Sequence, residues 1–259
     1  MKWPVRAAVL LVLVVGVLLV PAALAGTIKG SLHDLSEAMK NVEMAFWDNY
    51  NDYNQVCVYC HTPHNSLPGE QLLWNRQMPT GPYTLYRSES LISPVNAPGN
   101  HSLMCLSCHD GTIAVDAVVR MPLTSPDGRP LVWSNPTYPG YESMHGKMAN
   151  GSQSSASFVD CGVACHSASP IAEGFDYSGT YMTQNMSDDH PVTIDYPDPL
   201  TYGARFMPVP AGERWTNGVQ LYSNKVECGS CHDVHNPDWK PFLRCSNDAS
   251  ALCFTCHNK

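Results

Sequence analysis

The sequence lacks long apolar runs beyond its first 25 residues, and it has few basic side chains. The missing runs exclude further membrane-spanning helices, which need about 20 consecutive apolar residues. Its 15 Lys and Arg residues are outnumbered by 23 Asp and Glu residues, and no stretch forms a basic or acidic block. Because nucleic-acid binding depends on clustered positive charge, a nucleic acid is not expected as a partner. Charge that is dispersed in this way is typical of a protein surface that keeps the protein soluble.

The one long apolar run lies at the start of the chain. Lys2 and Arg6 lead into the stretch from Ala7 to Val20, and Ala23-Leu24-Ala25 forms a small-residue cleavage site. This order predicts a signal peptide over residues 1–25, since a run of 14 residues is short for a membrane anchor. We therefore expect an exported mature protein with 13 basic and 23 acidic side chains, a net charge of −10.

The chain is unusually rich in cysteine. Ten of its eleven cysteines form five pairs, and each pair is followed directly by a histidine. The motifs are Cys57-Val58-Tyr59-Cys60-His61, Cys105-Leu106-Ser107-Cys108-His109, Cys161-Gly162-Val163-Ala164-Cys165-His166, Cys228-Gly229-Ser230-Cys231-His232 and Cys253-Phe254-Thr255-Cys256-His257. C-x-x-C-H is the attachment signature of a c-type haem: both thiols bond to the vinyl groups and the histidine binds the iron. The extra residue in the third motif is a spacing that c-type haem attachment also tolerates.

Two other uses of paired cysteines compete with haem. Disulfides would not require the histidines, and zinc sites place their second ligand pair farther along the chain. Histidine is 11 of 259 residues, so chance does not put one after all five pairs. The sequence predicts five c-type haems, with the histidines of the motifs as proximal ligands.

The expected fold follows from how little chain is available per haem. The 234 residues after position 25 leave under 50 for each cofactor, and 21 prolines and 18 glycines interrupt long elements. We predict a multihaem cytochrome c fold: mostly irregular coil with short α-helices wrapped around a stacked haem chain, and little β-structure. It forms a single pentahaem domain over residues 26–259, with a soft internal boundary near 122–157. Periodicity predicts a helix near 35–46, and a strand or buried helical turn over 112–119.

Six histidines outside the motifs can supply the second axial ligands. They are His33, His64, His101, His145, His190 and His235. Five irons need five such ligands, so bis-histidine ligation throughout leaves one histidine over.

Two of these six lie three residues after a proximal histidine: His64 after His61, and His235 after His232. If the segment is helical, the two imidazoles project from one face, about 5–6 Å apart. They cannot then bind opposite sides of one porphyrin. Each is expected to bind the iron of a different haem and so to bring two haems together.

Other residues carry weaker signals. Cys245 belongs to no motif, and a buried small apolar role is favoured over a reactive thiol or an intermolecular disulfide. His232 and His257 are only 25 positions apart, so the last two haems are expected to be close neighbours. Three aromatic residues are expected to pack against haem: Trp74, Tyr83 and Tyr86.

Several segments together resemble the multihaem c-type cytochromes of electroactive, metal-reducing bacteria, and within them the tetrahaem type that polymerises into extracellular filaments, or nanowires. These segments are residues 31–36 (SLHDLS), 57–65 (CVYCHTPHN), 105–112 (CLSCHDGT), 188–192 (DDHPV), 228–236 (CGSCHDVHN) and 242–259 (FLRCSNDASALCFTCHNK). The resemblance implies bis-histidine haems for electron transfer and, in filament members, a distal histidine donated by the neighbouring subunit. By position it implies four distal ligands: His33, His64, His190 and His235.

The third motif departs from that family layout and adds a haem to it. His145, the nearest histidine ahead of the third motif, is the expected distal ligand of this haem, which leaves His101 as the spare. Cys245 stands where an apolar residue is expected.

The leading functional hypothesis is an electron relay that is not an enzyme. It forms a homopolymer outside the cell or at its surface, exchanging electrons with other redox proteins and with acceptors such as metal oxides. His33, near the mature N-terminus, is expected to reach a neighbouring subunit. The alternatives are a monomeric periplasmic shuttle or electron-transfer subunit, and a multihaem oxidoreductase. The oxidoreductase would need an iron without a distal ligand, whereas the distal candidates exceed the number required.

Overall fold

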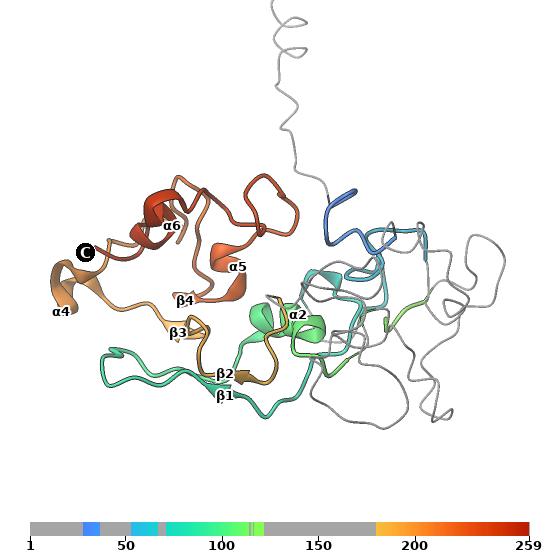
Figure 1. Ribbon diagram of the computed structural model, residues 1–259, viewed down its shortest axis with the longest axis horizontal. Coiled ribbons are helices and arrows are strands. Elements are labelled where there is room, and N and C mark those ends of the chain that lie inside the picture. Colours follow the sequence, from blue (N-terminus) through green and yellow to red (C-terminus); the bar gives the residue numbers. More distant parts are fainter. Residues whose placement is uncertain are drawn as a thin grey trace, which may run out of the picture.

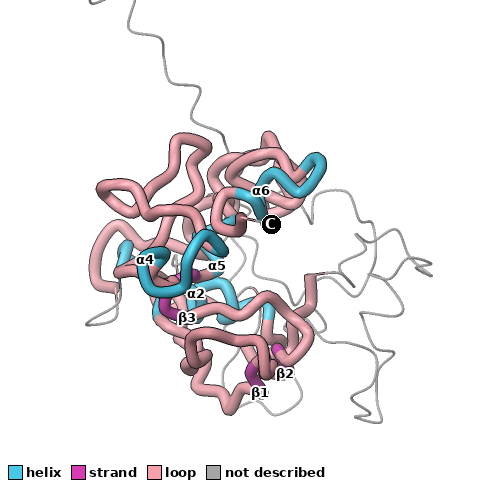
Figure 2. The backbone as a smooth tube through the Cα atoms, turned by 90° about the vertical axis from the view of Figure 1, so that its left-hand side faces the viewer, coloured by secondary structure: helices cyan, strands magenta, loops and turns pink. Residues whose placement is uncertain are grey.

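The computed structural model of the 259-residue chain describes residues 28–36, 53–66, 71–113, 115, 117–121 and 180–258. Loops and turns make up most of this part of the chain (Figure 2). The predicted low content of regular structure, with short helices and little sheet, is confirmed for these residues. The signal-peptide prediction, the boundary near 122–157, His145 and the third motif lie outside them.

The longest described helix is α2 (Asn100–His109), which contains the whole second motif. It starts after Gly99, whose backbone is extended, and buries a face that includes Ser102, Leu106 and Ser107. The remaining described helices are single turns: η2 (Gln71–Leu73), α4 (Pro199–Tyr202), η3 (Gly203–Arg205), α5 (Cys228–Cys231), η4 (Asp248–Ser250) and α6 (Ala251–Phe254). None of the described helices is long and apolar enough to cross a membrane.

The described strands are two residues long and join distant segments. β1 (Thr84–Leu85) pairs in parallel with β2 (Asn185–Met186). β3 (Ile194–Asp195) pairs antiparallel with β4 (Lys225–Val226), and a salt bridge between Lys225 and Asp195 lies across this pair. Such short pairs bury little apolar surface, so they act as local ties and do not form a sheet core.

The buried apolar residues form two small clusters beside the cysteine motifs. One contains Tyr53, Val58, Tyr59 and Val118, with Cys60 packed against it. The other consists of Leu106, Met186 and Val192, with Cys228 and Tyr83 at its margin. Because both clusters include motif residues, the core of the described chain is built where the haems are predicted.

Helix α2 lies near the middle of the molecule (Figure 1). The segments that carry β4, α5 and α6 lie to one side of it, and residues 28–36 and 53–66 lie to the other. α2 packs against α5 through Ser102, whose hydroxyl donates to the buried carboxylate of Glu227 and accepts from the Cys228 N–H at 3.2 Å. Gly99 leaves room for this contact, because a Cβ there would lie 2.8 Å from Glu227 Oε1 and the carboxylate would have to shift.

The prediction of a strand or helical turn over 112–119 is wrong for the part of this segment that is described. It consists of bends and turns. The Asp110 carboxylate accepts from both the N–H and the hydroxyl of Thr112, at 2.8 Å each, and so turns the chain away from a regular path. The helix predicted near 35–46 lies mostly outside the described residues.

The helical geometry considered for the C-H-x-x-H segments is also wrong. His61 forms an isolated β-bridge with Trp74, and Pro63 disfavours helical backbone at the preceding Thr62. His232 is likewise extended, with φ −107° and ψ 145°, and bridges to Leu243. The chain is therefore extended where it leaves each of these motifs, and His64 and His235 follow in a bend and a turn.

Candidate haem-attachment sites

In each described motif, a single turn of backbone brings the cysteine pair and the histidine together. The Cys57 carbonyl accepts from the N–H of Cys60 at 3.1 Å and of His61 at 2.7 Å. Equivalent bonds run from His232 to the Cys228 carbonyl and from His257 to the Cys253 carbonyl. The spacing of two residues is thus one helical turn, which places both thiols and the imidazole around one site.

Three proximal histidines are oriented by backbone carbonyls from outside their motifs. Nδ1 of His61 donates to Leu72 at 2.8 Å, Nδ1 of His109 to Thr180 at 2.7 Å, and Nδ1 of His232 to Pro241 at 2.9 Å. With Nδ1 protonated and bonded, the lone pair of each ring is on Nε2, which is then the nitrogen available to a metal. This is the second-sphere contact expected of an iron-binding histidine.

The carbonyl that orients His61 comes from strained backbone. Leu72 and Leu73 adopt left-handed conformations, with φ of 58° and 54°, and both side chains are exposed. Non-glycine residues seldom take this conformation, so surrounding contacts must hold it in place. The Thr62 N–H donates to the Leu73 carbonyl at 2.9 Å, which fixes this turn to the first motif.

Two further histidines lie opposite proximal histidines. The ring centres of His61 and His235 are 6.2 Å apart with an interplanar angle of 20°, and those of His109 and His33 are 6.0 Å apart at 62°. Imidazoles bound on opposite sides of one iron have ring centres roughly 6 Å apart, because each metal–nitrogen bond is about 2 Å long. Both pairs therefore have the spacing of an axial ligand pair.

His33 is packed against residues of its own chain. Its ring contacts Phe242 at 4.5 Å, and its Nδ1 has no hydrogen-bond partner among the described residues. Burial, and then the nearby His109, His232 and His235, lower the pKa of His33 to about 4. The ring is therefore neutral at physiological pH, and the neutral form is the one that binds metals.

The remaining described histidines occupy different settings. His64 and His190 are exposed; Asn65 Nδ2 lies 3.0 Å from the His64 ring, and His190 Nδ1 donates to the Pro191 carbonyl. His101, predicted as the spare, stacks on Tyr222 with ring centres 4.0 Å apart. The proximal His257 lies against Phe206, at 5.3 Å.

The surroundings of three motif cysteines favour neutral sulfur. Burial raises the pKa of Cys60 and of Cys231 to about 12, and that of Cys256 to about 11. A protonated thiol is uncharged, as is the thioether that a cysteine forms with a haem. The described cysteines are free thiols, and no group of three or more His, Cys, Asp or Glu side chains in this part of the chain could hold a metal ion.

These residues fit a haem. An iron between His61 and His235, or between His109 and His33, would have two protein ligands and need four more, which a porphyrin provides. The adjacent cysteine pairs would attach the porphyrin covalently. The motif cysteines, their histidines and the opposed His33 and His235 are the residues that would hold it.

The described motifs are contiguous in space. Asn75 Nδ2 donates to the Val58 carbonyl and Arg76 Nη2 donates to the Ser107 carbonyl, so these adjacent residues join the first motif to the second. The Cys228 N–H donates to Ser102 Oγ in α2, which joins the second motif to the fourth. The loop 217–220 joins the fourth motif to the fifth, because the Gln220 N–H donates to the Ser230 carbonyl and Asn217 Nδ2 donates to Thr255 Oγ1. The order in space is first, second, fourth, fifth.

Cys245 is less enclosed than predicted. Its side chain is half-buried and its sulfur accepts from Asn217 Nδ2 at 3.6 Å, while burial raises the pKa of the thiol. A raised pKa keeps the thiol protonated and poorly reactive.

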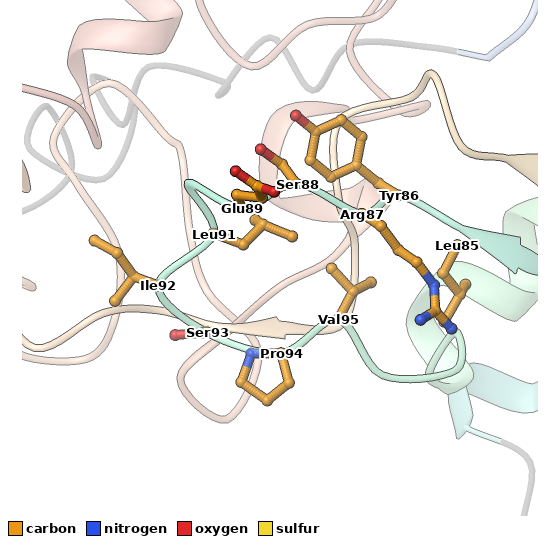
Figure 3. A pocket seen from close by; sticks show the side chains of 10 residues that line it. All are labelled: Leu85, Tyr86, Arg87, Ser88, Glu89, Leu91, Ile92, Ser93, Pro94 and Val95. Atoms are coloured by element: carbon orange, nitrogen blue, oxygen red, sulfur yellow. The ribbon is translucent and has the colours of Figure 1, made fainter.

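The aromatic residues expected to pack against haem have separate positions. Trp74 is buried, with its ring 5.7 Å from that of His61, and Tyr83 donates to Asp110 Oδ2 at 2.7 Å. Tyr86 instead lines a cavity of about 620 Å³ along the loop 85–95 (Figure 3). No cysteine or histidine is among its lining residues, so haem ligands do not form this cavity.

Four buried or half-buried polar residues next to the motifs were missed from the sequence: Asn75, Arg76, Glu227 and Arg244. The Arg76 guanidinium binds Ser107, inside the second motif, and Arg244 Nε donates to the carbonyl of Gly229, inside the fourth, at 2.7 Å. A lone polar residue in a loop has no periodicity or spacing that would reveal such a contact.

Comparison with known proteins addresses the C-terminal motifs. Residues 222–259 match the family described as Doubled CXXCH motif, a segment that holds the fourth and fifth motifs and Cys245. No curated protein matches the chain. The paired C-x-x-C-H motifs are c-type haem attachment sites, and they support a multihaem c-type cytochrome that functions in electron transfer.

Proposed function

We propose that the protein is an electron carrier with five covalently attached, bis-histidine c-type haems. The observation that carries this proposal is the contiguity of the motifs from the first to the second, fourth and fifth. When bound, c-type haems exchange single electrons, and attachment to neighbouring motifs would place them edge to edge. The chain's own residues fix the separations and keep the irons six-coordinate.

The opposed imidazoles support one axial pairing. His235 would be the distal ligand of the haem on the first motif, and His33 would be that of the haem on the second. His61 and His235 belong to motifs far apart in the sequence, so one iron would cross-link the two ends of the described chain. An iron with two imidazoles has no open position for a substrate, which favours a carrier over an oxidoreductase.

Spectroscopy of the purified holoprotein tests the carrier against the enzyme. A carrier gives low-spin ferric signals for every haem, and its reduced form does not bind carbon monoxide. A high-spin signal, or carbon monoxide binding by the reduced protein, would overturn complete bis-histidine ligation and favour the multihaem oxidoreductase.

We propose further that the protein is exported and assembles into an extracellular filament. This rests on the resemblance to filament cytochromes and on the exposure of two candidate ligands, His64 and His190, which a neighbouring copy can reach. These replace His33 as the candidates for ligation between subunits. The partners would be redox proteins and extracellular acceptors such as metal oxides.

Electron microscopy of the holoprotein and of material sheared from producing cells distinguishes the two modes of electron transport. Micrometre-long thin filaments mean that the haem chain continues between subunits. Discrete particles in both preparations contradict the filament and leave the monomeric periplasmic shuttle.

A further inference from the structure

Arg76 is a buried arginine placed between two haem motifs. The residue is fully buried, with 0% of its surface exposed. A guanidinium keeps its charge at any pH at which a protein is folded, so Arg76 puts a permanent positive charge in the interior. Removing such an ion from water costs several kcal/mol in real proteins, and the contacts of the buried group must offset that cost.

The guanidinium of Arg76 is fixed on the second motif. Nε donates to Ser107 Oγ at 3.1 Å and Nη2 donates to the Ser107 carbonyl at 2.9 Å, while Nη1 donates to the Val115 carbonyl at 2.7 Å. Ser107 lies directly between the two attachment cysteines, and it is itself fully buried. A haem bonded to Cys105 and Cys108 would have its attached edge at this residue.

The residues next to Arg76 hold it equally close to the first motif. The Asn75 N–H donates to the Cys60 carbonyl at 2.8 Å, and Asn75 Nδ2 donates to the Val58 carbonyl at 2.8 Å. Trp74 contacts the His61 ring. The three consecutive residues thus span from the first proximal histidine to the centre of the second motif.

From this placement we propose that Arg76 raises the reduction potentials of the haems on the first and second motifs. Each iron takes up one electron on reduction, and its positive charge falls by one. A fixed positive charge nearby disfavours the more positive, oxidised state, and the low dielectric of the interior strengthens the effect. Charge and burial around the cofactor are among the means by which proteins set haem potentials. Arg76 therefore favours the reduced state of the haems on the first and second motifs over that of the other haems.

The inference rests on the proposed haem binding, and spectroelectrochemical titration of purified holoprotein tests it. In Arg76→Gln, two haems per chain should shift to more negative midpoint potentials. Arg76→Lys retains the charge and should titrate like the wild type. Arg87→Gln removes one exposed positive charge from the loop 85–95, outside the motifs, and should also leave the titration curve unchanged.

A second variant keeps the test independent of any folding defect in Arg76→Gln. Ser107→Asp leaves Arg76 in place but adds a carboxylate where the Ser107 hydroxyl now accepts, so it offsets the charge and should shift the same two haems to more negative potentials. Unchanged potentials in fully haem-loaded Arg76→Gln or Ser107→Asp would overturn the inference and leave Arg76 a purely structural clamp. Wild-type protein without attached haem would instead overturn the proposed function itself.

Discussion

Each oriented proximal histidine depends on a carbonyl that its own motif does not supply. Leu72, Thr180 and Pro241 lie 11, 71 and 9 positions from the histidines that they bind. The attachment chemistry is thus encoded locally, whereas ring orientation is a property of the folded loops. Spacing alone therefore predicts which residues carry haem, but not how each imidazole is aimed.

Removal of a distal imidazole should open one iron without releasing a haem. In His235→Ala, the ring opposite His61 is lost while all cysteines remain. We expect one haem per chain to become high-spin and to bind carbon monoxide when reduced, with unchanged haem content. Electron paramagnetic resonance and carbon monoxide difference spectra measure this. His101→Ala, which removes a ring stacked on Tyr222, is the matched control and should remain fully low-spin.

Asn75 is expected to be important for stability. Its side chain is fully buried, donates to the carbonyls of Val58 and Arg120 and accepts from the Arg120 N–H at 2.8 Å. Asn75→Ala leaves these groups unsatisfied, which should lower the free energy of unfolding by about 2–4 kcal/mol. Guanidinium unfolding of the holoprotein measures the loss. The exposed Asn185→Ala is the control, and equal stability of the two variants would contradict the assigned role.

At the scale of elements, α2 is fastened on two sides by polar contacts. Ser107 binds Arg76 near the first motif, and Ser102 binds Glu227 beside the fourth. Glu227 also accepts from Thr193 Oγ1 at 2.9 Å, so the residue that precedes β3 joins the same contact. Small apolar clusters cannot specify a unique packing of so short a helix, and these buried hydrogen bonds supply the specificity.

Loss of the contact between α2 and α5 should disturb two haems together. Ser102→Ala removes the donor to Glu227 and leaves its carboxylate short of a partner in a site that is 4% exposed. We expect a loss of about 1–3 kcal/mol in the free energy of unfolding. The Soret circular dichroism couplet between haems on the second and fourth motifs should also change. Ser90→Ala, at an exposed loop position, should alter neither measurement.

The helices, strands and loops of the structure show which features the sequence patterns predict and which they do not. Low regular structure was predictable, because prolines, glycines and closely spaced motifs leave no room for long elements. The extended path after His61 and His232 was not deduced, although Pro63 was a visible signal against a helix. The loop at 112–119 was misjudged because the Asp110 side chain overrides an apolar pattern. Opposed imidazoles such as those of His61 and His235 come from residues 174 positions apart, which only the fold can bring together.

For the whole molecule, the haem count gives a direct prediction. If all five motifs are attachment sites, the intact mass of the holoprotein exceeds that of its polypeptide by five haem groups. Replacing both cysteines of the third motif, Cys161→Ser with Cys165→Ser, should remove one haem and leave the other four. A wild-type mass with four haems would contradict the extra attachment site. The double replacement of Cys253 and Cys256 by Ser is the control that should likewise lose one.

The hydrogen bonds on either side of residues 122–179 fasten both ends of this segment to the same small region. On the approach, the Val119 N–H donates to the Asn75 carbonyl at 2.7 Å; on the return, the Met182 N–H donates to the His109 carbonyl at 2.9 Å. Asn75 is hydrogen-bonded to the first motif, and His109 belongs to the adjoining second motif. Closing a loop costs free energy that rises only slowly with its length, so a segment with neighbouring ends can grow or shrink with little penalty. The third motif could therefore be gained or lost as a unit. Such a change would alter by one the number of electrons that the protein holds, and the contacts among the other four motifs would remain.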